Sequence, residues 1–218
     1  MDVSAYHVLE LQIAADPADR RRVMPAIRSE HRRIVDVGCG AGQTLIASRL
    51  PADVTAIGID CDPRALSLGR LLYPRLGLIR ARGEALPLPS RFFDLAISRV
   101  ALPYMSTGAA LGEMARVLRP GGDLWIALHP FSLVWDELKS SLKRRRWRIA
   151  LQRAYALANG AAVHLTGKEL PAPYRGKHHS FQTEGRIVRT LQSLGFENIR
   201  IEKGRFFVVT ATRKREAA

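Results

Sequence analysis

The sequence predicts an α/β domain with a mostly parallel β-sheet covered by helices on both faces. Between residues 34 and 128, short apolar segments rich in β-branched residues alternate with segments of helical character. This alternation is typical of parallel strands joined by crossover helices. Near the C-terminus, residues 196–202 and 206–212 predict two strands joined by a turn so short that they must pair antiparallel. A chain of 218 residues suits one domain with a substantial core.

The elements follow one another in a regular order. The first 30 residues predict one or two short helices, including one over 20–27 that Asp19 would cap and Pro25 interrupt. After residue 128 the pattern is helical over 131–160, and Gly and Pro then predict a loop over 165–180. The other predicted strands are 34–37, 54–59, 78–81, 93–98 and 124–128, and the predicted helices are 43–50, 63–72, 109–118 and one from 183 or 184 to Gly195.

Composition places the chain among ordinary globular proteins. Hydrophobic residues make up 47% and charged residues 25%. No stretch approaches the roughly 20 apolar residues of a membrane span, and the N-terminus lacks the pattern of a signal peptide. Cys39 and Cys61 are too few for a disulfide framework and have no metal-ligand spacing. We therefore expect a cytoplasmic protein without a bound metal; composition does not indicate its oligomeric state.

The positive charge is concentrated in the C-terminal part. The formal net charge is +14, and residues 139–218 contain 18 Lys and Arg against five acids. Residues 143–148 form a basic run that includes Trp147. This run is compatible with a solvated helix face, a cap over a substrate, a peripheral contact with an anionic membrane, or binding to RNA phosphates. The sequence leaves these interpretations open.

The strongest local signal is a glycine-rich turn after the first strand. Glycines at positions 38, 40 and 42 allow positive φ angles and leave no Cβ between the backbone and a ligand. The ligand would then lie close to the N-terminus of the following helix. The spacing differs from the G-x-G-x-x-G dinucleotide fingerprint, because position 43 is Gln, and the loop carries no basic residue for a pyrophosphate.

A second signal is the carboxylate at the end of the second strand. Asp60 follows the apolar segment 54–59 and lies 20 residues after Gly40. A carboxylate in this position accepts hydrogen bonds from ribose hydroxyls, and ligands of such sheets bind outside the carboxyl ends of the strands. The two signals together predict a nucleoside-containing ligand.

At these residues the chain resembles the class I S-adenosylmethionine-dependent methyltransferases. The run D-x-G-x-G-x-G over residues 36–42 is similar to their cofactor loop, and residues 58–60 resemble their ribose-binding strand end. Residues 84–89, 93–95 and 116–122 resemble the family's segments around the fourth and fifth strands. The resemblance implies a Rossmann-like, doubly wound seven-stranded sheet in the order 3-2-1-4-5-7-6 with strand 7 antiparallel. The small-molecule branch typified by quinone-biosynthesis methyltransferases is the most similar in appearance.

The resemblance also implies a set of cofactor contacts and a domain layout. Residues 36–42 would hold the methionine end of S-adenosylmethionine, Asp60 the ribose, and residues 83–85 the adenine. Arg82 stands where the branch often has an Asp that bonds the adenine. Residues 1–30 are expected to form a helical lid and residues 131–182 an inserted helical cap within a single domain of residues 1–218. The implied cofactor-binding residues are Asp36, Gly38, Cys39, Gly40, Gly42, Asp60, Cys61, Gly83, Glu84, Ala85 and Ser98.

Candidates for a general base lie after the predicted strands. Methyl transfer needs a base only where the acceptor must lose a proton of high pKa. His129 follows the fifth strand and Tyr104 lies shortly after the fourth. His178 and His179 in the predicted loop, and Tyr6 and His7 in the predicted lid, are further candidates.

These observations favour methyl transfer to a small-molecule acceptor. Two alternatives remain open: an RNA methyltransferase that uses the basic C-terminal region, and a cofactor-binding protein without transfer activity. The residues do not indicate which acceptor is methylated, or whether the methyl group goes to oxygen, nitrogen or carbon.

Overall fold

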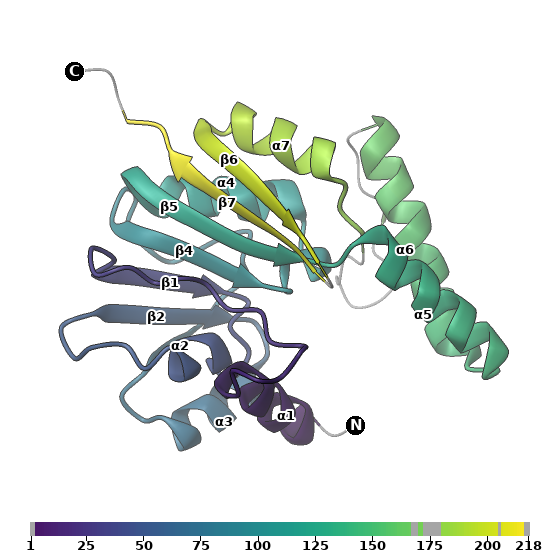
Figure 1. The fold of residues 1–218 in the computed structure, drawn as a ribbon, viewed down its shortest axis with the longest axis horizontal. Coiled ribbons are helices and arrows are strands. Elements are labelled where there is room, and N and C mark those ends of the chain that lie inside the picture. The colour runs from purple at the N-terminus through teal and green to yellow at the C-terminus, as the bar shows by residue number, and fades with distance from the viewer. Residues whose placement is uncertain (1–2, 167–169, 172–179, 205, 216–218) are drawn as a thin grey trace.

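A computed structural model describes residues 3–166, 170–171, 180–204 and 206–215. In this described part, seven strands form one sheet in the order β3-β2-β1-β4-β5-β7-β6 (Figure 1). Strands β1 to β5 are parallel, whereas β7 pairs antiparallel with both β5 and β6. The predicted fold class and strand order are therefore confirmed. The strands are β1 Arg33–Val37, β2 Thr55–Asp60, β3 Gly77–Arg80, β4 Phe93–Arg99, β5 Leu118–Leu128, β6 Phe196–Lys203 and β7 Phe207–Arg213.

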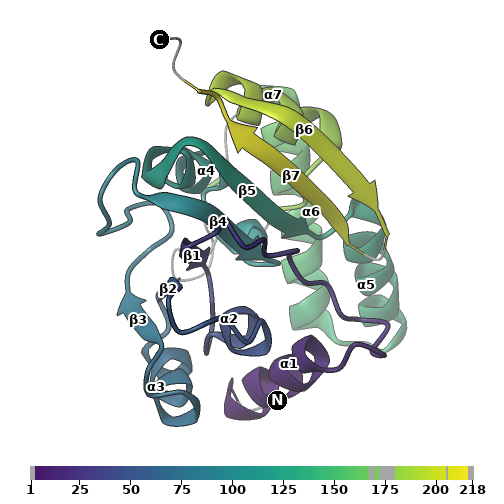
Figure 2. The same cartoon turned by 60° about the vertical axis from the view of Figure 1, so that its left-hand side comes forward.

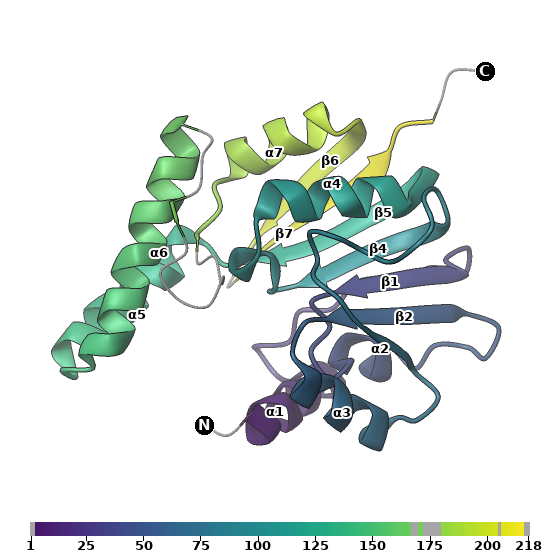
Figure 3. The same ribbon diagram turned by 180° about the vertical axis from the view of Figure 1, so that it is seen from behind.

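Helices cover both faces of the sheet. Helices α4 and α7 pack on one face through a large apolar core that includes Leu111, Met114 and Leu191 (Figure 3). On the other face, α2 packs on β1, β4 and β5, and α1 lies next to α2 and α3 (Figure 2). The helices are α1 Val3–Ala15, α2 Gln43–Ala47, α3 Pro63–Leu72, α4 Thr107–Val117, α5 Phe131–Lys143, α6 Trp147–Thr166 and α7 Glu184–Ser193, with a 3₁₀ turn η1 at Leu102–Tyr104.

Two helical predictions need correction. The expected helix over 20–27 is absent, and residues 16–32 run irregularly across the sheet, with Val23 and Ile27 packed against its apolar face. The long helix expected over 131–160 is broken at residues 144–146, where Arg145 has a φ of 53°. The second half, α6, continues to Thr166, inside the segment predicted as a loop. None of the described helices is long and apolar enough to cross a bilayer.

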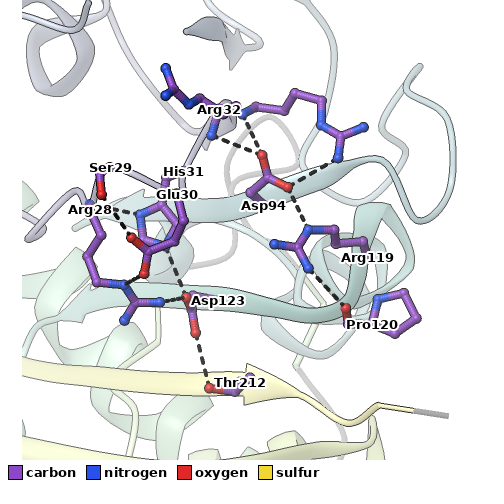
Figure 4. Close-up of polar contacts among 11 residues, drawn as sticks. Arg28, Ser29, Glu30, His31, Arg32, Asp94, Arg119, Pro120, Asp123 and Thr212 are labelled. Atoms are coloured by element: carbon purple, nitrogen blue, oxygen red, sulfur yellow. Dashed lines mark hydrogen bonds and ion pairs between the residues drawn. The ribbon is translucent and has the colours of Figure 1, made fainter.

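Two carboxylates join the amino ends of the central strands (Figure 4). Asp94 of β4 accepts hydrogen bonds from the backbone N–H groups of Arg32 and Arg33, at 3.0 and 2.8 Å, and from Nε of Arg119 at 2.6 Å. Asp123 of β5 binds His31 at 3.0 Å and accepts the hydroxyl hydrogen of Thr212 at 3.0 Å. These contacts hold the start of β1 against β4, β5 and β7.

Candidate active site

The carboxyl ends of β1, β2, β4 and β5 surround a cavity of about 810 Å³. The turn after β1 forms one wall, and α1 closes the cavity from the side. Residues of α5 and α6 reach it from the opposite direction. Of the predicted cofactor and catalytic residues, those that line the cavity are Tyr6, His7, Gly38, Cys39, Gly40, Asp60, Cys61, Gly83, Glu84, Tyr104 and His129.

The glycine turn adopts the left-handed conformations that its sequence predicts. Gly38, Gly40 and Gly42 have φ angles of 78°, 58° and 83°. Residues that carry a Cβ rarely adopt such angles. The backbone N–H groups of Gly38 and Cys39 both donate to the carbonyl of Ile59 in β2, at 2.8 and 3.0 Å. The turn is therefore fixed to the neighbouring strand as well as to β1.

The space beside these glycines differs from the prediction. A Cβ on Gly38 would overlap Ala101, and a Cβ on Gly42 would overlap Leu76. A Cβ on Gly40 would meet Gln43 and His7, which line the cavity, as does Ala101 beside Gly38. Gly38 and Gly40 therefore lie at the cavity, whereas Gly42 is buried against Leu76 and lies outside the cavity lining.

Asp60 links the second strand to the glycine turn. Its Oδ2 accepts the backbone N–H of Gly40 at 2.8 Å, and its Oδ1 accepts that of Asp62 at 2.8 Å. A carboxylate has about four lone-pair sites, so both oxygens retain acceptor capacity toward the cavity. This geometry suits a ligand with two adjacent hydroxyl groups.

Asp36 lies beneath the turn and does not line the cavity. Its side chain is fully buried, and neither carboxylate oxygen has a hydrogen-bond partner among the described residues. Burial raises the pKa of Asp36 to about 7, against the opposing effect of the Arg99 guanidinium. An orphaned buried carboxylate is rare in folded proteins and marks a site where a cationic ligand group would be stabilised.

The segment expected to meet the adenine is held in place by its own polar contacts. Glu84 accepts the backbone N–H of Ser106 at 3.0 Å and pairs with Arg82 at 3.2 Å. Gly83 is buried, and a Cβ there would meet the sulfur of Met105. Ala85 is exposed and lies outside the cavity lining. Arg82 is thus occupied by an ion pair at the cavity edge.

Ser98 and the two cysteines have simple environments. Ser98 is fully buried, and its hydroxyl donates to the carbonyl of Val37 at 2.8 Å, so it braces β4 against β1 and lies outside the cavity lining. Burial raises the pKa of the Cys39 thiol well above its usual value, which leaves it protonated and unreactive at neutral pH. Cys61 is exposed at the edge of the cavity.

The two main catalytic candidates line the cavity. Desolvation raises the pKa of Tyr104, with Arg153 opposing the shift, so this phenol is a poor base at neutral pH. His129 follows β5, and its ring meets that of Phe206 edge-on with 5.5 Å between centroids. His178 and His179 lie outside the described residues. Within the described part of the chain, no group of three or more His, Cys, Asp or Glu residues could hold a metal ion.

Helix α1 contributes polar groups to the cavity, of which the sequence singles out His7 but not Glu10. Glu10 of α1 pairs with Arg99 at 3.1 Å, and Nε of Arg99 donates to the Thr44 hydroxyl at 3.1 Å. His7 contacts the Gln43 amide at 2.7 Å. Burial lowers the pKa of His7, partly offset by the charges of Asp60, Asp62 and Glu10.

A second ion pair, from the opposite side of the cavity, also escaped prediction. Glu137 of α5 pairs with Arg153 of α6 at 2.7 Å, and both line the cavity. For Arg99, the sequence offers one signal: it is a charged residue directly after a predicted buried strand. No local signal placed Glu10, Glu137 or Arg153 at the site, because helix packing brings them there.

The strand order, the left-handed glycine turn and the acid at the end of β2 define a class I S-adenosylmethionine-dependent methyltransferase fold. Comparison with known proteins agrees, because residues 35–126 match the family of methyltransferase domains. This match over residues 35–126 agrees with the resemblance to class I S-adenosylmethionine-dependent methyltransferases that the motifs predict.

Individual relatives are more distant. A ubiquinone/menaquinone biosynthesis C-methyltransferase of Geobacter sulfurreducens is 34% identical over 51% of this chain and 48% of that protein. A malonyl-[acyl-carrier protein] O-methyltransferase of the same organism is 28% identical over 91% of this chain and 70% of that protein. A methyltransferase structure from Methanosarcina mazei shares the fold, with a TM-score of 0.59 and 20% identity over 87% of this chain and 95% of that one. The chain spans about half the length of most curated relatives that it matches.

Proposed function

We propose that this protein transfers a methyl group from S-adenosylmethionine to a small-molecule acceptor bound in the cavity at the carboxyl ends of the strands. The observation that carries the proposal is the glycine turn fixed to Asp60, with acceptor capacity left on that carboxylate and an orphaned acid, Asp36, beneath the turn. Similarity to small-molecule methyltransferases supports the same conclusion.

The residues fit the groups of this cofactor. Asp60 would accept hydrogen bonds from the ribose hydroxyls, and of residues 83–85, Gly83 and Glu84 would border the adenine. The buried carboxylate of Asp36 would favour the cationic methionine end, because an opposite charge nearby compensates its desolvation. The glycine turn, which has no Cβ at Gly38 or Gly40, would let the ligand approach the backbone closely. Residues 1–30 and 131–182 would act as lid and cap, and the cap would set acceptor specificity.

Methyl transfer requires the protein mainly to position the methyl donor and the acceptor. When bound, the cofactor supplies an electrophilic methyl group that is transferred by in-line displacement. The chain's residues hold the acceptor in line, exclude water and, for an acceptor of high pKa, remove a proton. His129 is the better placed base of the two main candidates, because desolvation works against the ionised form of Tyr104.

Cofactor binding provides the direct test of this proposal. Isothermal titration should show S-adenosylmethionine binding to the wild-type protein, and Asp60→Ala should weaken it by about 30-fold or more, since hydrogen bonds to a charged group contribute about 1.5–3 kcal/mol each. Asp53→Ala removes an exposed acid outside the cavity and serves as the control. Thermal melts would verify that both variants fold.

Two results would contradict the proposal. Unchanged affinity in a folded Asp60→Ala protein would remove this carboxylate from the binding site. Binding of a pyrophosphate-containing dinucleotide in preference to S-adenosylmethionine would show that S-adenosylmethionine is not the ligand of this cavity.

A further inference from the structure

The junction of α5 and α6 projects away from the sheet. Figures 1 and 3 show the two helices side by side at one end of the molecule, with their junction at the point farthest from the strands. The helices pack on each other through buried residues such as Val134 and Ala156. We define the α5–α6 tip as the exposed side chains at this junction: Leu142, Lys143, Arg144, Arg145, Arg146, Trp147, Arg148, Ile149 and Leu151.

The tip carries a dense positive charge that forms no ion pair with an acid among the described residues. Five consecutive or nearly consecutive cations lie within residues 143–148, and α6 contains no acidic residue. The two acids of α5 are already engaged, since Asp136 pairs with Lys139 at 2.9 Å and Glu137 pairs with Arg153 at 2.7 Å. Both acids lie more than a helical turn away from the basic run. The tip is therefore complementary to a strongly anionic surface.

Large apolar side chains stand among these cations. Trp147 and Leu151 are 61% and 62% exposed, and they lie one helical turn apart on the same face of α6. Leu142 and Ile149 are 45% and 38% exposed. Isolated exposed apolar residues are ordinary, but four around one basic run form an amphipathic surface.

We propose that the α5–α6 tip docks on the surface of an anionic lipid bilayer. Basic side chains would bind the anionic headgroups, and Trp147 with its aliphatic neighbours would enter the boundary between headgroups and acyl chains. A second copy of this chain is disfavoured because two tips would repel each other. RNA is less favoured because Trp147 is the only aromatic ring among the defined tip residues, and its aliphatic neighbours Leu142, Ile149 and Leu151 offer no further ring on which bases can stack.

Docking would bring the cavity close to the lipid. Glu137 and Arg153 line the cavity and lie six residues or fewer from the basic run along their helices, which corresponds to about 9 Å. A bilayer bound at the tip would therefore lie beside the cavity, where a lipophilic acceptor could be exchanged. Only this consequence rests on the proposed function, since docking itself does not require methyl transfer.

Vesicle co-sedimentation tests the proposal with the full chain. The wild-type protein should bind vesicles of 70% phosphatidylcholine and 30% phosphatidylglycerol, and it should not bind pure phosphatidylcholine vesicles. Arg144→Glu/Arg146→Glu should weaken binding by about 30-fold or more, because each basic residue near an anionic surface contributes roughly fivefold or more. Trp147→Ala should weaken it by about tenfold through lost apolar insertion.

A matched control separates the tip from net charge. Arg75→Glu/Lys214→Glu makes the same change in net charge at exposed positions outside α5 and α6 and should bind as the wild type does. Circular dichroism melts would verify folding of each variant. Equal loss of binding in both double variants, no binding to anionic vesicles, or tip-dependent binding to single-stranded RNA that exceeds vesicle binding at the same salt would each overturn the proposal.

Discussion

Asp36 is the residue at which local stability and the proposed function conflict most clearly. The side chain is fully buried at the end of β1, its oxygens have no partner among the described residues, and burial raises its pKa to about 7. Such a group destabilises the protein without its ligand. Violations of this kind are expected at functional sites, where a ligand rather than the fold compensates them.

This conflict predicts an unusual dependence of stability on pH. In the unfolded chain Asp36 ionises near pH 4, whereas in the folded protein it stays protonated until about pH 7. The folded state therefore loses stability as pH rises between these values and carries the full penalty above pH 7. Asp36→Asn cannot ionise, so relative to wild type it should gain up to about 4 kcal/mol between pH 4 and pH 7.5.

Urea unfolding of the cofactor-free proteins, followed by circular dichroism at several pH values, measures this difference. A constant difference between wild type and Asp36→Asn across the range would mean that the carboxyl is ionised throughout in the folded protein.

The sequence predicts those parts of the site whose position depends only on neighbouring residues of the chain. The positions of Asp60 and of the glycine turn at the cavity could be predicted, because strand ends and left-handed turns have local sequence signals. The ion pair of Arg99 with helix α1 could not be predicted in the same way. Its partner Glu10 lies 89 positions earlier, and only the packing of α1 on α2 and α3 brings the two together.

At the scale of elements, α1 is held over the site by a few polar contacts. The side chain of Arg99 is only 10% exposed, so removal of Glu10 would leave a nearly buried cation without its ion-pair partner. Glu10→Ala should therefore increase local opening of α1, with amide exchange over residues 4–15 accelerated by about 10- to 100-fold. Hydrogen exchange with mass spectrometry measures this directly.

Gln12→Ala changes an exposed residue of the same helix and should leave exchange near the wild-type rate. If Glu10→Ala exchanged no faster than Gln12→Ala, the ion pair with Arg99 would have no part in closing α1.

The boundaries of several helices and strands could not be predicted from the sequence pattern. The strands could be predicted because apolar runs bounded by Gly or charged residues are distinctive. The break at Arg145 could not, since no Gly or Pro marks it. The absent helix over 20–27 has a tertiary cause, because Val23 and Ile27 bury their side chains on the sheet in an irregular conformation. The sequence predicts the fifth strand over 124–128, yet β5 already begins at Leu118.

At the scale of the whole molecule, the two ends of the sheet differ in whether a buried carboxylate is hydrogen-bonded. Asp36 at the carboxyl end has no partner among the described residues, whereas Asp94 at the amino end is fully hydrogen-bonded (Figure 4). Burial by itself would raise the pKa of Asp94, but hydrogen bonds from Arg119 and Arg33 outweigh it and lower the pKa. The amino end thus stabilises the sheet while the carboxyl end is left for a ligand.

Asp94→Asn should consequently show a pH dependence opposite in sign to that of Asp36→Asn. A lowered pKa contributes stability above the unfolded value near pH 4, and this stability is lost as pH falls through the folded pKa. At pH 7 the variant should lose about 2–3 kcal/mol, less than for a fully buried pair, because both guanidinium groups are 38% exposed. As pH falls from about 4 through the folded pKa, the stability of the variant should approach that of the wild type.

Asp53→Asn provides the matched comparison, since the Arg32–Asp53 pair is exposed on both sides and should contribute less than about 1 kcal/mol. Urea unfolding at pH 7 and at about pH 2.5 distinguishes the two cases. A loss in Asp94→Asn that is equally large at both pH values would indicate that packing of the side chain, and not its charge, joins β1 to β4 and β5.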